Sequence, residues 1–222
     1  MEPSRKIIML IYGRALSFLL SLLIPFFLTR ILLKEDYGSY QQLVMIYTIV
    51  QAILLFGMPQ SLLYYYPRKE KGEHPLLVRQ TWTILLLSAL FVMGLFWLGS
   101  QTIGSHHLKE YLILLGIYTS LMIFVMPIQN LLILEGKIST AMWLMIFFTV
   151  IDVAILPTAA WLNPTTLGIL HGIIFAALLK VTMVLFHVYS TYFTKETLGT
   201  PYLKEQLAYG IPVGLTAMVY VI

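Results

Sequence analysis

Six long apolar stretches set the strongest limit on what this chain can fold into. They lie at residues 7–33, 43–66, 80–100, 111–134, 141–162 and 166–193, and a seventh begins near Gln206. About 20 apolar residues in a helix cross the roughly 30 Å hydrocarbon core of a bilayer. Helices are the expected form because lipid offers no partner to an unpaired backbone amide, and none of the stretches alternates apolar and polar residues. The sequence predicts an all-α integral membrane protein, a six-helix transmembrane bundle followed by the start of a seventh helix.

Composition agrees with this class and argues against several others. Hydrophobic residues make up 59% of the chain and charged residues 11%, whereas soluble domains carry roughly 25% charged residues. The first stretch is too long for the apolar core of a cleavable signal peptide. The net charge of +4 comes from Lys and Arg in short loops, where such residues indicate which side of the membrane a loop occupies. No nucleic-acid partner is therefore expected.

Sequence motifs give no support to an enzyme, a cofactor or a metal site. Cysteine is absent, which removes disulfides and thiolate ligands. Aspartate occurs only at 36 and 152, and the motifs GxSxG, HExxH and GxxxxGK[ST] do not occur. The His106-His107 pair lacks the further ligands that a metal site needs. We therefore expect no catalytic residues, no cofactor and no metal.

The distribution of Lys and Arg predicts a cytoplasmic N-terminus. In that orientation three basic residues lie outside, Arg30, Lys34 and Lys109, and Lys180 lies within the membrane. Ten lie near the cytoplasm: Arg5, Lys6, Arg14, Arg68, Lys69, Lys71, Arg79, Lys137, Lys195 and Lys204. Short loops rich in Lys and Arg stay on the cytoplasmic side of a membrane.

Arg14 is the first candidate for a functional charge inside the membrane. It lies about one turn into the first helix, and Ser17, Ser21 and Pro25 follow at spacings that place them on one helical face. One interpretation is a cation that faces a cavity and pairs with an anionic substrate, with Ser17 and Ser21 lining that cavity. The other is an Arg whose guanidinium extends to the headgroups. Arg30 cannot share a face with Arg14 on a straight helix, and a role as interfacial anchor is favoured for it.

Asp152 and Lys180 are the most internal charges. Their depths nearly match on adjacent antiparallel helices, so we expect them to pair and so avoid two isolated charges in low dielectric. The pair is interpreted either as a structural clamp or as a site for a coupling ion or proton. Uncharged polar residues are candidates either to line a cavity or to link helices by hydrogen bonds: Gln41, Gln42, Gln51, Gln129 and Asn130.

Three runs of the sequence resemble the polysaccharide-export (oligosaccharide) flippases, which move lipid-linked oligosaccharides across the bacterial inner membrane. They are YGRALSFLLSLLIPFFLTRILLKEDYGSYQQL at 12–43, GMPQSLLYYYPR at 57–68 and LKEQLAYGIPVGL at 203–215. The resemblance covers essentially the whole chain as the N-terminal half of a longer protein. It implies a lobe at 1–205, the beginning of a second lobe at 206–222, and alternating access by two lobes of the multidrug/oligosaccharidyl-lipid/polysaccharide exporter type.

The resemblance also implies which residues contact substrate. Related lipid II flippases have an Arg in an R-x-L-x-F setting, which Arg14 matches in RALSF, and a second Arg that resembles Arg30 in TRIL. The acidic residue that follows the second Arg in those proteins has no clear counterpart in KEDYGSY, which argues against lipid II as substrate. The partners implied are an undecaprenyl-pyrophosphate-linked oligosaccharide, the bilayer, a coupling ion such as H⁺ or Na⁺, and a C-terminal lobe or a second copy. The alternatives are a multidrug or cation-coupled exporter of the same fold and a non-transporting membrane scaffold.

Overall fold

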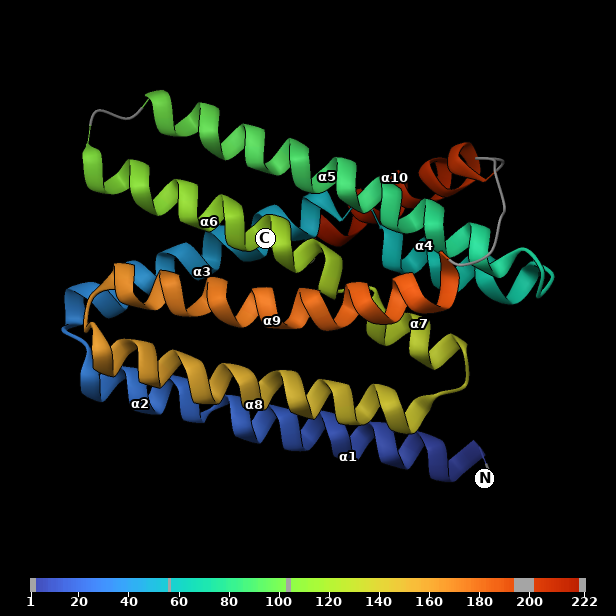
Figure 1. Ribbon diagram of the computed structural model, residues 1–222, viewed down its shortest axis with the longest axis horizontal. Helices are drawn as coiled ribbons and strands as arrows, with labels where there is room; N and C mark the ends of the chain where they lie inside the picture. The colour runs from blue at the N-terminus through green and yellow to red at the C-terminus, as the bar shows by residue number, and fades with distance from the viewer. Residues whose placement is uncertain (1–2, 56, 103–104, 194–201, 220–222) are drawn as a thin grey trace.

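The computed structural model describes residues 3–55, 57–102, 105–193 and 202–219, and within them the regular structure is entirely helical (Figure 1). This confirms the all-α prediction. The elements are α1 (Pro3–Ser21), α2 (Leu23–Ile31), α3 (Lys34–Leu54), α4 (Met58–Tyr65), a 3₁₀ turn (Tyr66–Arg68), α5 (His74–Thr102), α6 (His106–Val125), α7 (Ile128–Leu134), α8 (Ile138–Leu162), α9 (Thr166–Tyr192) and α10 (Leu203–Val219).

Six helical segments of the described chain are long and apolar enough to cross a membrane, as predicted. They are Ile7–Ile31, Lys34–Arg68, His74–Thr102, Leu108–Leu134, Ile138–Leu162 and Thr166–Tyr192. The second, third, fourth and fifth begin earlier than hydropathy alone indicated, because their first turns contain polar residues that remain helical. The chain is therefore a multi-pass membrane protein.

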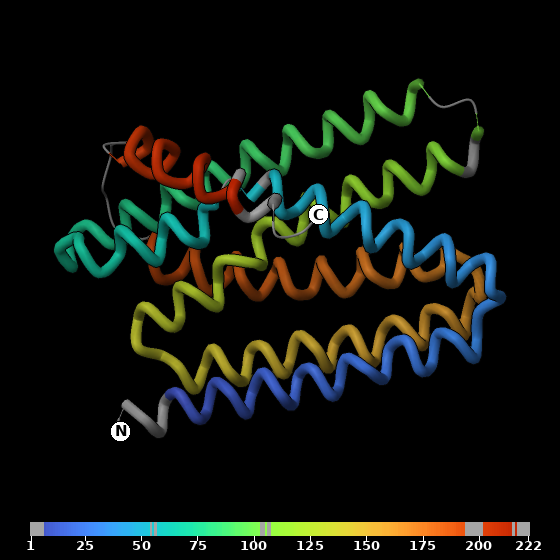
Figure 2. Tube along the Cα trace, turned by 180° about the vertical axis from the view of Figure 1, so that it is seen from behind, coloured from blue at the N-terminus to red at the C-terminus, as the bar shows by residue number. Residues whose placement is uncertain are grey.

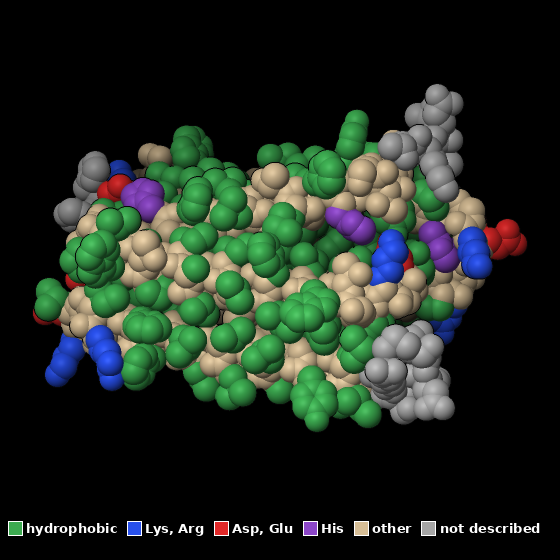
Figure 3. Space-filling model, turned by 60° about the horizontal axis from the view of Figure 1, so that its bottom comes forward, with side chains coloured by type: hydrophobic (Ala, Val, Ile, Leu, Met, Phe, Trp, Pro, Cys, Tyr) green, Lys and Arg blue, Asp and Glu red, His purple; other side chains and the backbone are tan. Residues whose placement is uncertain are grey.

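The turns between spans gather at the two ends of the bundle. The chain's N-terminus, the α4–α5 and α7–α8 connections, the end of α9 and the start of α10 lie at one end, which we call the N-terminal end (Figure 1). The α2–α3, α5–α6 and α8–α9 connections lie at the opposite end (Figure 2). On the face in Figure 3 the charged side chains gather towards these ends, and hydrophobic side chains cover the surface between them. This arrangement fits a bundle that crosses the bilayer lengthwise.

Three spans are interrupted, each for a local chemical reason. The first breaks at Leu22, three residues before Pro25, whose missing N–H cannot bond to the Ser21 carbonyl. The second breaks before α4, where Gly57 has a φ of 60° in the left-handed region. The fourth breaks between α6 and α7 at Pro127.

The spans differ in how much of their surface the bundle covers. Half of the most apolar part of the α9 span is buried (50%), compared with 11% for the α1–α2 span and 11% for α8. α9 lies at the centre, in contact with α6 and α8, whereas α1 packs mainly on α8 (Figures 1 and 2). The α1–α8 pair therefore presents a broad apolar surface either to lipid or to another part of the assembled protein.

α10 lies across the break in the second span. A Cβ built on Gly57 would stand 2.4 Å from the Gly210 carbonyl oxygen and 3.0 Å from the Gly214 nitrogen, so the backbones of α4 and α10 touch. Small residues four apart allow such close approach of helices. The predicted seventh helix thus begins at Leu203, slightly before Gln206. The assignment of residues 206–222 to a second lobe stays a prediction.

Candidate functional site

The middle of the bundle contains an ion pair between α8 and α9. Asp152 and Lys180 are each the fifteenth residue of their helix. Lys180 Nζ donates to both carboxylate oxygens of Asp152, at 2.5 Å and 2.6 Å. The Lys180 side chain is 6% exposed and that of Asp152 is 31% exposed. The structure therefore contains the contact that the sequence predicted.

Three tyrosines lie in the part of the interior next to this pair, and the sequence analysis missed them. Tyr40 and Tyr47 of α3 and Tyr118 of α6 pack in the same hydrophobic cluster as Ile151 and Ile155 of α8 and Ala176 of α9. The rings of Tyr47 and Tyr118 have centroids 4.7 Å apart. Tyr40 and Tyr47 are seven residues apart on one face of α3, a spacing that was visible in the sequence. The interior of the bundle thus holds polar side chains contributed by four helices, α3, α6, α8 and α9.

Gln51 extends the cluster along the same face of α3, four residues beyond Tyr47. It is 5% exposed, and its Nε2 has no hydrogen-bond partner among the described residues. An unpaired amide donor in a dry site is costly. Gln51 is therefore an interior polar residue.

The residues predicted to share one face of the first helix, from Arg14 to Pro25, do not all have the same surroundings once α1 packs on α8. Gly13 and Ser17 face α8: a Cβ on Gly13 would lie 2.4 Å from Cγ of Met142, and Ser17 is 8% exposed. Arg14 points away from this contact and is exposed. Ser21, at the break, donates its hydroxyl to the Phe18 carbonyl at 2.7 Å. Arg14 is thus a cation on the exposed α1 surface, and Ser17 belongs to the helix contact.

Arg30 lies far from Arg14. It is exposed in the last turn of α2, near the opposite end, with its guanidinium carbon 3.9 Å from the centroid of the Phe26 ring. This position suits a cation near a helix C-terminus and at a membrane interface. The structure does not bring the two arginines together within this bundle.

The remaining polar candidates lie in two places. Gln41 is exposed and donates to the Tyr37 hydroxyl at 2.7 Å, and Gln42 is exposed beside it. Gln129 and Asn130 are half-buried in α7, just after the break at Pro127. None of these four contacts the Asp152–Lys180 pair in the hydrogen bonds found between described residues.

Asp36 links two spans at the opposite end, a contact that sequence reasoning did not anticipate. Its Oδ1 accepts from both the backbone N–H and the hydroxyl of Thr166, each at 2.8 Å. The carboxylate thereby caps the N-terminus of α9, where a negative charge is favourable. Both aspartates of the chain are therefore committed to bonds between spans.

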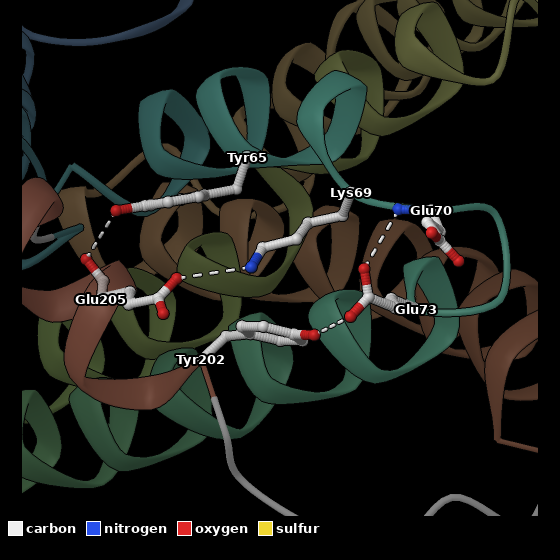
Figure 4. A network of polar contacts seen from close by, with 6 residues as sticks. All are labelled: Tyr65, Lys69, Glu70, Glu73, Tyr202 and Glu205. Atoms are coloured by element: carbon white, nitrogen blue, oxygen red, sulfur yellow. Dashed lines mark hydrogen bonds and ion pairs between the residues drawn. The ribbon is translucent and has the colours of Figure 1, made fainter.

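A polar network at the N-terminal end attaches α10 to the α4–α5 connection (Figure 4). Glu205 lies 3.6 Å from Lys69 Nζ, and its backbone carbonyl accepts from the Tyr65 hydroxyl at 3.2 Å. The Tyr202 hydroxyl donates to the Glu73 carboxylate, and the Tyr202 ring lies under the Lys69 ammonium. The bond from Tyr202 holds the pKa of Glu73 below its usual value, and the same bond raises the pKa of Tyr202.

No cluster of three or more His, Cys, Asp or Glu side chains able to hold a metal ion occurs among the described residues. His106 and His107 lie where side chains are outside the described part of the structure. The chemistry available at the sites above is therefore charge pairing and hydrogen bonding within an apolar bundle.

A protein-family model described as "Polysaccharide biosynthesis protein" matches residues 4–222, which is nearly the whole chain. No curated protein and no solved structure is significantly similar to it.

Proposed function

Since the chain belongs to the polysaccharide biosynthesis protein family, we propose that it is one lobe of a flippase for lipid-linked oligosaccharide. The substrate would be an undecaprenyl-pyrophosphate-linked sugar, moved across the bacterial cytoplasmic membrane by alternating access. A C-terminal lobe or a second copy of the chain would supply the other wall of the cleft. The N-terminus would be cytoplasmic, as the positive-inside count indicates.

The exposed position of Arg14 is the observation that carries this proposal. Arg14 lies on one of the two spans with the least buried surface, beside the α1–α8 contact rather than inside it. A pyrophosphate entering the membrane loses its hydration, and a guanidinium offsets that cost through charge-assisted, bidentate hydrogen bonds. Arg30, near the opposite end, would meet the same anion at the other side of the membrane.

Complementation of a strain that lacks the protein tests the role of Arg14. Charge-assisted hydrogen bonds contribute roughly 1.5–3 kcal/mol, so Arg14→Ala should lower the rate of surface-polysaccharide export about tenfold to a hundredfold at equal protein level. Arg14→Lys should restore part of the loss, since it keeps the charge without the bidentate geometry. Lys71→Ala removes an exposed loop charge at the same end and should leave export unchanged. Full export by Arg14→Ala would refute the proposal.

A cation-coupled exporter of the same fold is the second candidate, favoured by the ion pair and tyrosines in the middle of the bundle. In that case export should depend on a H⁺ or Na⁺ gradient and should be lost in Asp152→Asn while Arg14→Ala retains it. A scaffold without transport activity predicts that no phenotype changes when the charges at 14, 152 and 180 are removed.

A further inference from the structure

An apolar groove of about 650 Å³ runs between the first half of α5 and the last part of α9, in the half of the membrane nearest the N-terminal end. Its size lies within the roughly 300–1,000 Å³ range of ligand pockets. Leu86 of α5 and Phe186 and Tyr189 of α9 form its walls, and Phe124 lines it from the last turn of α6. The fourth span bends after Phe124 and continues as α7 towards α8, so it does not fill the space between α5 and α9.

Two polar groups stand at this otherwise apolar groove. Trp82 lines it as a residue that is 4% exposed, and its buried indole Nε1 has no hydrogen-bond acceptor among the described residues. Arg79, one turn earlier on α5, has its guanidinium carbon 5.3 Å from the centroid of the Phe193 ring, which also lines the groove. The indole nitrogen is buried, whereas a cation at the rim suits a ligand whose head carries anionic oxygens.

We propose that this groove holds a resident anionic glycerophospholipid. One acyl chain would lie along Leu86, Phe186 and Tyr189, and the phosphate would lie near Arg79 at the level of the headgroups. Basic pockets between transmembrane helices on the cytoplasmic side are suited to anionic lipid heads. The groove is on α5, α6 and α9, whereas Arg14 is on α1, which packs on α8 across the bundle (Figures 1 and 2). The site is therefore separate from the proposed substrate face.

Quenching of tryptophan fluorescence by brominated lipid measures occupancy directly. Replacing Trp97, Trp143 and Trp161, all exposed, by Phe leaves Trp82 as the single reporter in the groove. The chain is reconstituted in phosphatidylcholine vesicles that contain the same mole fraction of either dibrominated phosphatidylglycerol or dibrominated phosphatidylcholine. A second variant that keeps Trp97 alone reports bulk lipid next to α5.

Trp82 should show about fivefold tighter association with the anionic lipid than with the zwitterionic one, since one cation near a headgroup contributes an affinity gain of that order. Trp97 should show no such preference. Arg79→Gln should remove the preference at Trp82, while Arg68→Gln, an exposed arginine at the same end, should retain it. Thr182→Phe, which adds bulk to the groove at an exposed position, should reduce quenching of Trp82 by both lipids.

Three results would overturn the proposal. The first is equal quenching of Trp82 by the two brominated lipids, and the second is a preference that persists in Arg79→Gln. The third is recovery of fluorescence with equimolar undecaprenyl pyrophosphate but not with excess unbrominated phosphatidylglycerol, which would make the groove a polyprenyl site. Circular dichroism of each variant shows whether its helices are intact, and Thr182→Phe keeps the test decisive if Arg79→Gln misfolds.

Discussion

Breaking the Asp152–Lys180 pair from one side should cost more than removing it entirely. Asp152→Asn leaves the Lys180 ammonium in a site where its side chain is 6% exposed. An unpaired buried charge of this kind destabilises by about 3–5 kcal/mol. Lys180→Met leaves Asp152, whose side chain is 31% exposed, so its cost should fall at the lower end of that range or below it. The double change Asp152→Leu with Lys180→Met removes both charges and should be close to neutral.

The free energy of unfolding in mixed detergent micelles, followed by helical ellipticity against denaturant, gives the three values for a double-mutant cycle. Lys34→Met, which removes an exposed charge at the opposite end, serves as the control and should change stability by less than about 0.5 kcal/mol. A small effect of Asp152→Asn, together with a double variant no more stable than the single ones, would refute the reasoning, because it would show that the pair is hydrated.

Export by the same variants separates the two interpretations of the pair. A structural clamp predicts that the double variant, which is stable and uncharged, exports polysaccharide at the normal rate. A coupling site predicts that it folds and does not export, since the titratable or ion-binding group is gone. The stability cycle makes this comparison possible, because it identifies a variant whose loss of activity cannot be attributed to unfolding.

Three further predictions concern the contacts that join the spans. Asp36→Ala should lower stability by about 1 kcal/mol, the usual contribution of a helix N-cap, measured in the same denaturation assay. The Tyr202 bond lowers the pKa of Glu73 from its ordinary value of 4.5. The stabilisation that this carboxylate gives to α10 docking is therefore fully present above pH 4.5 and is lost as the pH falls through the lowered pKa. The same bond raises the pKa of Tyr202 from its ordinary value of 10.0. The stabilisation that the hydroxyl gives to α10 docking is therefore fully present below pH 10.0 and is lost as the pH rises through the raised pKa. The protection of α10 amides, measured relative to the intrinsic exchange rate at each pH, should thus be greatest between these limits, and Tyr202→Phe should abolish both changes. The rings of Tyr64 and Tyr209 are stacked with centroids 4.5 Å apart, and the chain contains no cysteine. In the variant with Tyr64→Cys and Tyr209→Cys, a short thiol cross-linker should therefore join the two positions. If export stops on cross-linking, α10 belongs to the moving second lobe, and if export continues, the predicted boundary at 206 is contradicted.

The sequence predicted the spans well because hydropathy and span length follow from the solvent alone. It also identified the Asp152–Lys180 contact, since an unpaired charge inside a bilayer is costly and two opposite charges at the same depth lower that cost by pairing. The tyrosine cluster was missed because a tyrosine in an apolar stretch resembles an interface anchor until its depth and neighbours are known. The contact of Gly57 with Gly210 was missed for another reason: it depends on the direction in which α10 returns to the bundle, and no local pattern determines that direction.

Arg14 and the central ion pair differ in what they need from the rest of the protein. Asp152 finds its counter-charge on the neighbouring helix, and three tyrosines from α3 and α6 lie in the adjacent cluster, so its partner belongs to the same bundle. Arg14 lies on a surface where the bundle offers it no carboxylate among the ion pairs of the described residues. A charge that the lobe itself satisfies is suited to holding helices together, and a charge on the lobe's exposed face is suited to a ligand that arrives there. This difference is why we assign the substrate anion to Arg14 and expect Asp152 and Lys180 to keep α8 and α9 together while the lobe moves as a unit.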